Sequence, residues 1–249
     1  MSTENAAPRF PLIPITYSPD WDYSNHVTIF SIEMTMIHNV FIRGLNSIYE
    51  NAPSIPASSS DVIPFVGYAL AWVSNIHDHH HGEEDIVFPF LQENFPDDMH
   101  KNIEEHKTFR GGLDALEEYL KAVQQGTKGV KWDGEKVKAL IEAFGDGLVE
   151  HLHEEIPTIS PERLSQVDHD GLAKMVAVHN EHIKNLPMAT AHVHVFTHHD
   201  FETYPSWPPL PAPVSWFVRN VLYFRRHSFW KFAPYSRTGK PQTYVAPSQ

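Results

Sequence analysis

The sequence predicts an all-α protein built on an up-down four-helix bundle. Sixteen of the twenty prolines lie in residues 1–64 or 187–249, so the intervening chain holds few residues that break a helix. Apolar residues there recur with the helical period of about 3.6 residues over four long segments. These segments are 26–50, 65–92, 97–124 and 133–159. The connections between them are short or polar, so neighbouring helices are expected to run antiparallel.

The first predicted helix, 26–50, carries one histidine within its apolar stripe. His38 falls on the same face as five apolar residues: Phe30, Met34, Phe41, Ile42 and Leu45. A single histidine on such a face is usually a core residue with a hydrogen-bonded ring. Taken alone, this stripe therefore predicts a helix packed against other helices and nothing more.

The second predicted helix, 65–92, is unusually rich in histidine near its end. At about 100° per residue, His79 and Glu83 fall within the apolar stripe. His80 falls at the edge of that stripe, and His81 faces the opposite side. The pattern predicts that His79 and Glu83 point inward.

The third and fourth predicted helices follow the same rule. His106 shares a face with the apolar residues of 97–124, including Phe109. In 133–159 the apolar stripe leads into His151, and Glu155 follows one turn later. Each of the four helices thus directs at least one histidine toward the interior.

Six inward-facing groups that can bind a metal result from this pattern: His38, His79, Glu83, His106, His151 and Glu155. Burying two carboxylates without partners costs several kcal/mol each, and a pair of divalent cations removes that cost. The chain has no cysteine, so nitrogen and oxygen ligands are left, which suit iron, manganese or zinc. Two alternatives stay open: a buried ionic network without metal, and a bundle that uses its histidines as a pH-responsive core.

These residues resemble the hemerythrin-like, or HHE cation-binding, domains. The run from His79 through Glu83 is similar to the HxxxEE motif of the second helix in that family, and His106 with Phe109 to its HxxF motif. His38 and the pair His151-x-x-x-Glu155 stand where the family has its first-helix and fourth-helix ligands. The resemblance covers residues 26 to about 160, and the tail motifs HHDFETYPSWPPLP and HSFWKFAP resemble fungal members.

The resemblance implies two iron ions, bridged by an oxo or hydroxo group and by the two glutamates. Such a centre binds O2 or peroxide and, in an enzyme, oxidises a small molecule; neither that molecule nor any catalytic residue can be read from the sequence. The competing interpretation is a non-catalytic module that binds or senses iron or oxygen.

Two departures from the family pattern bear on that choice. The third helix has Asn102 where the family usually has a second histidine, which predicts an open coordination position for a reactant beside Asn102. His77, His80 or a histidine of a fifth helix are candidates to fill it. The fourth helix has HxxxE where oxygen carriers of the family have HxxxxD, which disfavours reversible oxygen carriage.

The predicted organisation is an extended segment at 1–25, the bundle at 26–186 and a proline- and aromatic-rich extension at 187–249 that packs on it. A fifth helix is expected at 168–185, where His179 and His182 are interpreted as a solvated or packing face rather than a second metal site. The basic aromatic stretch 214–232 is expected to cover the open end of the metal pocket, with contact to a membrane surface as the alternative.

The run AHVHVF and the residues after it contain four further histidines. These are His192, His194, His198 and His199. The alternation suits an exposed strand or loop, and a surface metal patch is the alternative.

The net charge is −12 with no basic stripe, which argues against a nucleic-acid partner. The chain shows neither a signal-peptide pattern nor a long apolar run, so a cytoplasmic location is expected.

Overall fold

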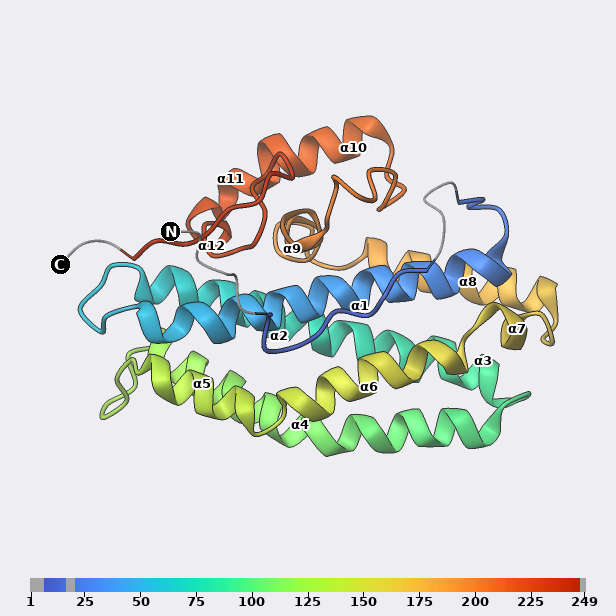
Figure 1. Cartoon of the computed structure of the whole chain (residues 1–249), viewed down its shortest axis with the longest axis horizontal. Helices are drawn as coiled ribbons and strands as arrows, with labels where there is room; N and C mark the ends of the chain where they lie inside the picture. The colour runs from blue at the N-terminus through green and yellow to red at the C-terminus, as the bar shows by residue number, and fades with distance from the viewer. Residues whose placement is uncertain (1–6, 17–20, 247–249) are drawn as a thin grey trace.

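Four long helical segments run alongside one another and form the frame of the molecule (Figure 1). They are α1 (His26–Asn51), α2 (Val62–Gly82), α4 (Pro96–Gln124) and the pair α5 (Gly134–Glu142) and α6 (Gly145–Thr158). The computed structural model describes residues 7–16 and 21–246. Within this described part the regular structure is helical apart from one isolated bridge, so the prediction of an all-α bundle is confirmed.

The second helical segment changes its winding where the acidic residues begin. After α2, residues Glu83–Val87 form a π-helical turn in which the N–H of Phe88 bonds to the carbonyl of Glu83, five residues back. The short helix α3 (Phe88–Gln92) follows. Pro89 lacks an N–H, and its ring would clash with a carbonyl one turn back in a regular α-helix, which accounts for the widened turn before it.

The fourth predicted helix, 133–159, is divided in two, so the expectation of one continuous helix was wrong. The chain turns between α5 and α6 at Ala143 and Phe144. Gly145 and Gly147 follow directly, and glycine in a helix costs about 1 kcal/mol relative to alanine. Gly145 also lies so close to the ring of Phe10 that a Cβ atom there would come within 2.7 Å of it. The break lets the N-terminal segment pack closely at this point.

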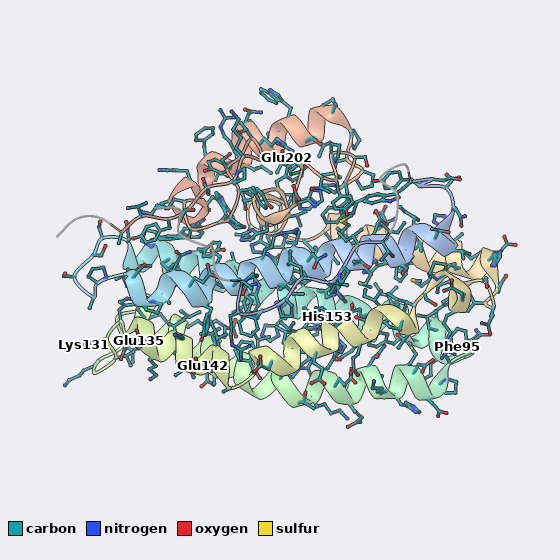
Figure 2. All side chains as sticks on the ribbon, viewed as in Figure 1. Phe95, Lys131, Glu135, Glu142, His153 and Glu202 are labelled. Atoms are coloured by element: carbon teal, nitrogen blue, oxygen red, sulfur yellow. The ribbon has the colours of Figure 1, made fainter. Side chains whose placement is uncertain are left out.

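The N-terminal segment 7–16 is extended and bound to α1 through two asparagine side chains. Asn46 exchanges two hydrogen bonds with the backbone of Phe10, at 2.9 and 2.8 Å. Asn39 does the same with Ile13, at 2.8 and 3.0 Å. His153 of α6, labelled in Figure 2, donates to the carbonyl of Pro11 at 3.0 Å. Of the segment predicted to be extended, residues 1–6 and 17–20 lie outside the described residues.

The chain beyond the bundle is helical as well and forms a layer over α1 and α2 (Figure 1). The predicted fifth helix is α8 (His169–Lys184), which follows the short α7 (Pro161–Leu164). The extension then contains α9 (Ala191–His198), α10 (Ala212–Phe217), a π-helical turn (Val218–Leu222), α11 (Tyr223–Arg225) and α12 (His227–Trp230). Glu202, labelled in Figure 2, marks this layer.

The expectation of an exposed strand or a surface metal patch in AHVHVF was wrong. This run begins α9, and His194, His198 and His199 are buried. The ring of His198 stacks on that of His194 and its Nε2 lies 2.7 Å from the hydroxyl of Tyr68. The alternation of apolar and histidine residues suggested a strand, but this segment is a helix that is buried on more than one side. It is buried in this way because α9 packs between the bundle and the tail.

The end of the tail packs firmly on the bundle, whereas α10 and α11 remain partly exposed. Trp230 and Phe232 are fully buried, and Lys231 forms an ion pair with Asp61. By contrast, the side chain of Trp216 is 62% exposed. None of the helices in the described chain is long and apolar enough to cross a membrane.

Replacing the buried tail tryptophan should destabilise the fold, whereas replacing the exposed one should not. We expect Trp230→Ala to lower the free energy of unfolding by about 3–5 kcal/mol, because it removes a large side chain from a close-packed site. Trp216→Ala should change it by less than about 0.5 kcal/mol. Urea denaturation of both variants measures the difference, and equal effects would show that the tail does not pack as described.

Candidate metal centre

The six predicted donor residues come together in the core in two adjoining groups, together with one further histidine. The first group contains His38, His79, Glu83 and Glu155, and the second contains His80, Glu83, His106 and His151. Within each group the donor atoms lie within 4.8 Å of one another. Glu83 belongs to both groups, so its carboxylate lies between them.

The first group joins α1, α2 and α6. His38 Nε2 lies 3.1 Å from His79 Nε2 and 3.4 Å from Glu155 Oε2. Glu83 Oε1 lies 2.8 Å from His79 Nε2 and 3.9 Å from His38 Nε2. Two nitrogens and two carboxylates thus face a common point.

The second group joins α2, α4 and α6. The Nε2 atoms of His106 and His151 are 3.0 Å apart, and Glu83 Oε2 lies 3.6 Å from His106 Nε2. The ring of His80 is 4.3 Å from that of His106, between centroids, and His80 Nε2 is buried without a hydrogen-bond partner. This group offers three imidazoles and one carboxylate.

Three of the histidines are oriented by a hydrogen bond at Nδ1, the ring nitrogen that points away from the donor groups. His38 Nδ1 lies 2.8 Å from the carbonyl of Leu152. His106 Nδ1 lies 2.7 Å from a carboxylate oxygen of Glu84, and His151 Nδ1 lies 3.0 Å from one of Glu105. Because these oxygens can only accept, each Nδ1 carries the proton and each Nε2 presents a lone pair.

The facing lone pairs indicate a cation. With both Nδ1 atoms protonated, His106 and His151 direct two lone pairs at each other across 3.0 Å, and neither can donate a hydrogen bond. Two imidazole nitrogens that bind one ion at about 2.1 Å and at a right angle to each other lie about 3.0 Å apart. His38 and His79 are similarly spaced, with 3.1 Å between their Nε2 atoms, and His38 also carries its proton on Nδ1. The donor chemistry and its spacing therefore fit metal ions.

The two carboxylates give a second, independent indication. Glu83 and Glu155 are fully buried, and none of their four oxygens accepts a well-formed hydrogen bond. Burial, and then the charge of Glu83, raise the pKa of Glu155 well above its ordinary value. Burial would also raise the pKa of Glu83, but the imidazoles of His79 and His38 hold it well below its ordinary value. Without a cation, only one of the two carboxylates is readily ionised.

The buried histidines are in the form that binds metals. Burial lowers the pKa of His38 to about 4 and that of His80 well below its ordinary value. Burial also lowers the pKa of His106. These rings are neutral at physiological pH, as a ligand must be.

His80 is the inward-facing residue that the sequence analysis placed at the edge of the stripe. That placement was wrong because α2 is buried on two sides: it packs against α1, α9 and α12 as well as against α4. His79 faces α1, where Phe41 lies 4.9 Å from its ring, while His80 faces α4. The sequence contained an indication that His80 points inward, because the apolar residues Val73 and Ile76 lie on the same side of the helix. Both are fully buried.

Asn102 is not a member of either donor group. Its side chain is buried, and its Nδ2 donates to Thr158 Oγ1 at 3.1 Å. His80 gives the second group its third imidazole. It thus takes the place of the missing histidine at position 102, as one of the candidates named from the sequence. His77 belongs to neither group and lies 3.6 Å from Asp114.

A cavity of about 420 Å³ reaches the first group at His79. It lies between α1, α2, α8, α9 and residues 207–211, so the opening is beside His79 and not beside Asn102 as the sequence suggested. The part of the tail at 214–232 does not line it; the covering comes from 186–211. A larger cavity of about 520 Å³ is lined by Lys131 and Glu135, at the end of the bundle opposite Phe95 in Figure 2, and by none of the donors.

The comparisons with known proteins agree with this arrangement. The sequence pattern of the hemerythrin HHE cation binding domain matches residues 32–162. The dimeric xanthone biosynthesis cluster protein R11 of Cryptosporiopsis sp. (strain 8999) is 28% identical over 261 aligned positions, which cover 97% of this chain and 95% of that protein. No solved structure matches the chain.

Replacing His80 should impair metal binding, whereas replacing its neighbour should not. His80→Ala removes one of three imidazoles from the second group, so we expect the metal affinity of that group to fall at least tenfold. His81 is exposed, so His81→Ala should bind metal as the parent does. Calorimetric titration with ferrous iron under anaerobic conditions measures both, and unchanged binding by His80→Ala would exclude it as a ligand.

The carboxylate behind His151 should matter in the same assay. Glu105→Ala removes the acceptor that orients His151, and such a loss typically lowers metal affinity about 10–100-fold. Glu104 precedes it and pairs with Lys107 on the surface, so Glu104→Ala is the matched control. Equal affinities of the two variants would contradict the orienting role of Glu105.

Proposed function

This chain belongs to the hemerythrin HHE cation-binding family, and we propose on that basis that its two donor groups hold a pair of iron ions. His38, His79 and Glu155 would hold one ion, His80, His106 and His151 the other, and Glu83 would bridge them. Manganese and zinc also suit this donor set, since it contains imidazoles and carboxylates and no thiolate. The family resemblance favours iron.

The observation that supports this proposal most strongly is the shared carboxylate of Glu83. It lies fully buried between two groups of imidazoles, and a second buried carboxylate lies beside it. Glu155 lies within 3.8 Å of His151 as well as 3.4 Å from His38, so it is near both groups and suits a second bridge. Two cations would supply the positive charge that this arrangement needs.

The proposed activity is the binding of O2 or peroxide, followed by oxidation of a small organic molecule. A bound iron pair supplies the site for oxygen and the electrons for its reduction. The chain's own residues would orient the ligands and exclude water. Leu152, Glu84 and Glu105 fix the orientations of the histidine rings. Phe41 and Phe109 pack against His79 and His80 and keep water from them. Each donor group supplies four side chains, which leaves positions for a reactant.

The relative described as a dimeric xanthone biosynthesis cluster protein gives the activity a context. We extend that context to this chain and infer a role in the synthesis of a small organic compound, in the cytoplasm. The second candidate function is a sensor of iron or oxygen without catalysis. A sensor calls for a closed site, whereas the cavity at His79 favours an enzyme.

The proposal predicts two iron atoms per chain and an absorption that depends on oxygen. Protein purified under reducing conditions, or reconstituted anaerobically with ferrous iron, should contain close to two iron atoms by elemental analysis. Exposure to air should then produce a near-ultraviolet band. Folded protein that takes up no iron would eliminate the proposal.

Removal of the metal should lower stability. Iron that binds the folded state alone stabilises it, by about 4 kcal/mol when its concentration is 1,000 times its dissociation constant. We therefore expect the melting temperature to fall by several degrees after treatment with a chelator, and to recover on addition of ferrous iron. An unchanged melting temperature in iron-loaded and chelated protein would contradict a metal in the core.

A further inference from the structure

The cavity at His79 is built largely by parts of the chain outside the four-helix frame. One wall is α1 with Phe30 and Phe41, and another is α9 with Phe196. Residues 207–211 and α8 close the remaining sides. Its volume of about 420 Å³ lies within the range of about 300–1,000 Å³ that is usual for small-molecule sites.

The walls of this cavity are mainly apolar and aromatic. Phe30, Phe41, Phe196 and Trp207 line it and are all buried, so their positions are set by the core. Proline side chains from 207–211 add further flat apolar surface. Such walls favour a ligand with fused or linked aromatic rings, because ring faces pack against ring faces and exclude water.

One acidic group faces this apolar surface. Glu33 of α1 lines the cavity four residues before Ile37, which also lines it. Burial raises the pKa of Glu33 to about 7, and the neighbouring Trp207 lowers it only in part. A carboxyl group in such a position can accept a hydrogen bond from a hydroxyl group of the ligand or donate one to a carbonyl.

The remaining polar lining does not suit an anion. Burial lowers the pKa of His179 to about 4 and also lowers that of His192, so both rings are neutral at physiological pH. The ammonium group of Lys184 pairs with Glu181 at 2.5 Å, and Asp78 adds a further acid to the wall. A carboxylate or phosphate ligand would therefore meet the carboxyl groups of Glu33 and Asp78, and the ammonium group among the described lining residues is already paired.

From these observations we propose that the cavity binds an uncharged aromatic compound with a phenolic hydroxyl group, which hydrogen-bonds to Glu33 while its rings pack against the aromatic walls, next to His79. As the identity of the substrate, this assignment rests on the proposed function, because His79 would hold one of the irons. As a binding site, it depends only on the walls and on Glu33.

Binding of two related probes tests the proposal. The first probe is 2-naphthol, an uncharged two-ring phenol, and the second is 2-methoxynaphthalene, which has the same rings and no hydroxyl donor. We expect the full-length protein to bind both and to prefer 2-naphthol by about tenfold, the contribution of one hydrogen bond to an ionisable group. Calorimetry measures both affinities. No binding of either probe at millimolar concentration overturns the proposal.

Two pairs of variants separate the walls from the acid. Glu33→Gln should weaken 2-naphthol about tenfold and leave 2-methoxynaphthalene unchanged, while Glu50→Gln, on an exposed part of the same helix, should change neither. Ala191→Phe fills the cavity and should abolish binding of both probes. Ala57→Phe makes the same change in the larger cavity and should have no effect. An equal loss in Ala57→Phe and Ala191→Phe overturns the assignment, as does an equal loss of both probes in Glu33→Gln.

A measurement on the parent protein guards against misfolded variants. The indole N–H signal of Trp207 in a nitrogen-15 NMR spectrum, identified by its absence in Trp207→Phe, should shift on addition of 2-naphthol. The signal of Trp132, which lines the larger cavity, should stay in place. A shift of Trp132 without one of Trp207 overturns the proposal.

Metal loading is measured on the same samples, so that the proposed iron pair and the proposed ligand of the cavity can be tested independently. Probe binding without iron uptake overturns the proposed function and the substrate role, and the binding site stands. Iron uptake without probe binding overturns this inference and leaves the proposed function intact.

Discussion

The structure depends on one electrostatic constraint: two carboxylates lie in the core without hydrogen bonds. Glu83 and Glu155 are both fully buried, and three of the imidazoles around them, those of His38, His106 and His151, carry the proton on Nδ1 and direct a lone pair inward. Positive charge that enters a core of this kind stabilises it, because an unpaired buried carboxylate costs more than an ordinary packing defect. Charge balance therefore links the fold to metal binding, and each surrounding feature either holds a donor or excludes water from it.

The outer layers serve that constraint in different ways. Two partly exposed carboxylates, Glu84 of the π-helical turn and Glu105 of α4, orient His106 and His151 through their Nδ1 atoms, and their contact with water lowers the cost of their charge. The extension beyond the bundle covers α2 on its outer side, whereas His80 is covered from within the bundle by His106, Phe109 and His151. The same extension leaves a cavity beside His79. An added layer of chain thus shapes the access to the donors.

The sequence was sufficient wherever one buried stripe determined the outcome. The four long segments and the six inward-facing donors follow from helical periodicity, because each of those helices has a local apolar face. Periodicity failed for the helix at 191–198, where a second layer of chain changed the number of buried faces, and for His80, where two frame helices widen the buried stripe of α2. It also failed at Gly145, where a close approach of Phe10 divides a helix, and no local pattern reveals a contact 135 residues away in the chain.

The most direct test of the charge-balance account is a crystal structure of the iron-loaded protein with anomalous scattering recorded at the iron absorption edge. The account predicts two anomalous peaks in the core, one beside His38 and His79 and one beside His106 and His151, with the carboxylate of Glu83 between them. A single peak elsewhere, or a core without any peak in which water molecules hydrogen-bond to both carboxylates, would contradict it.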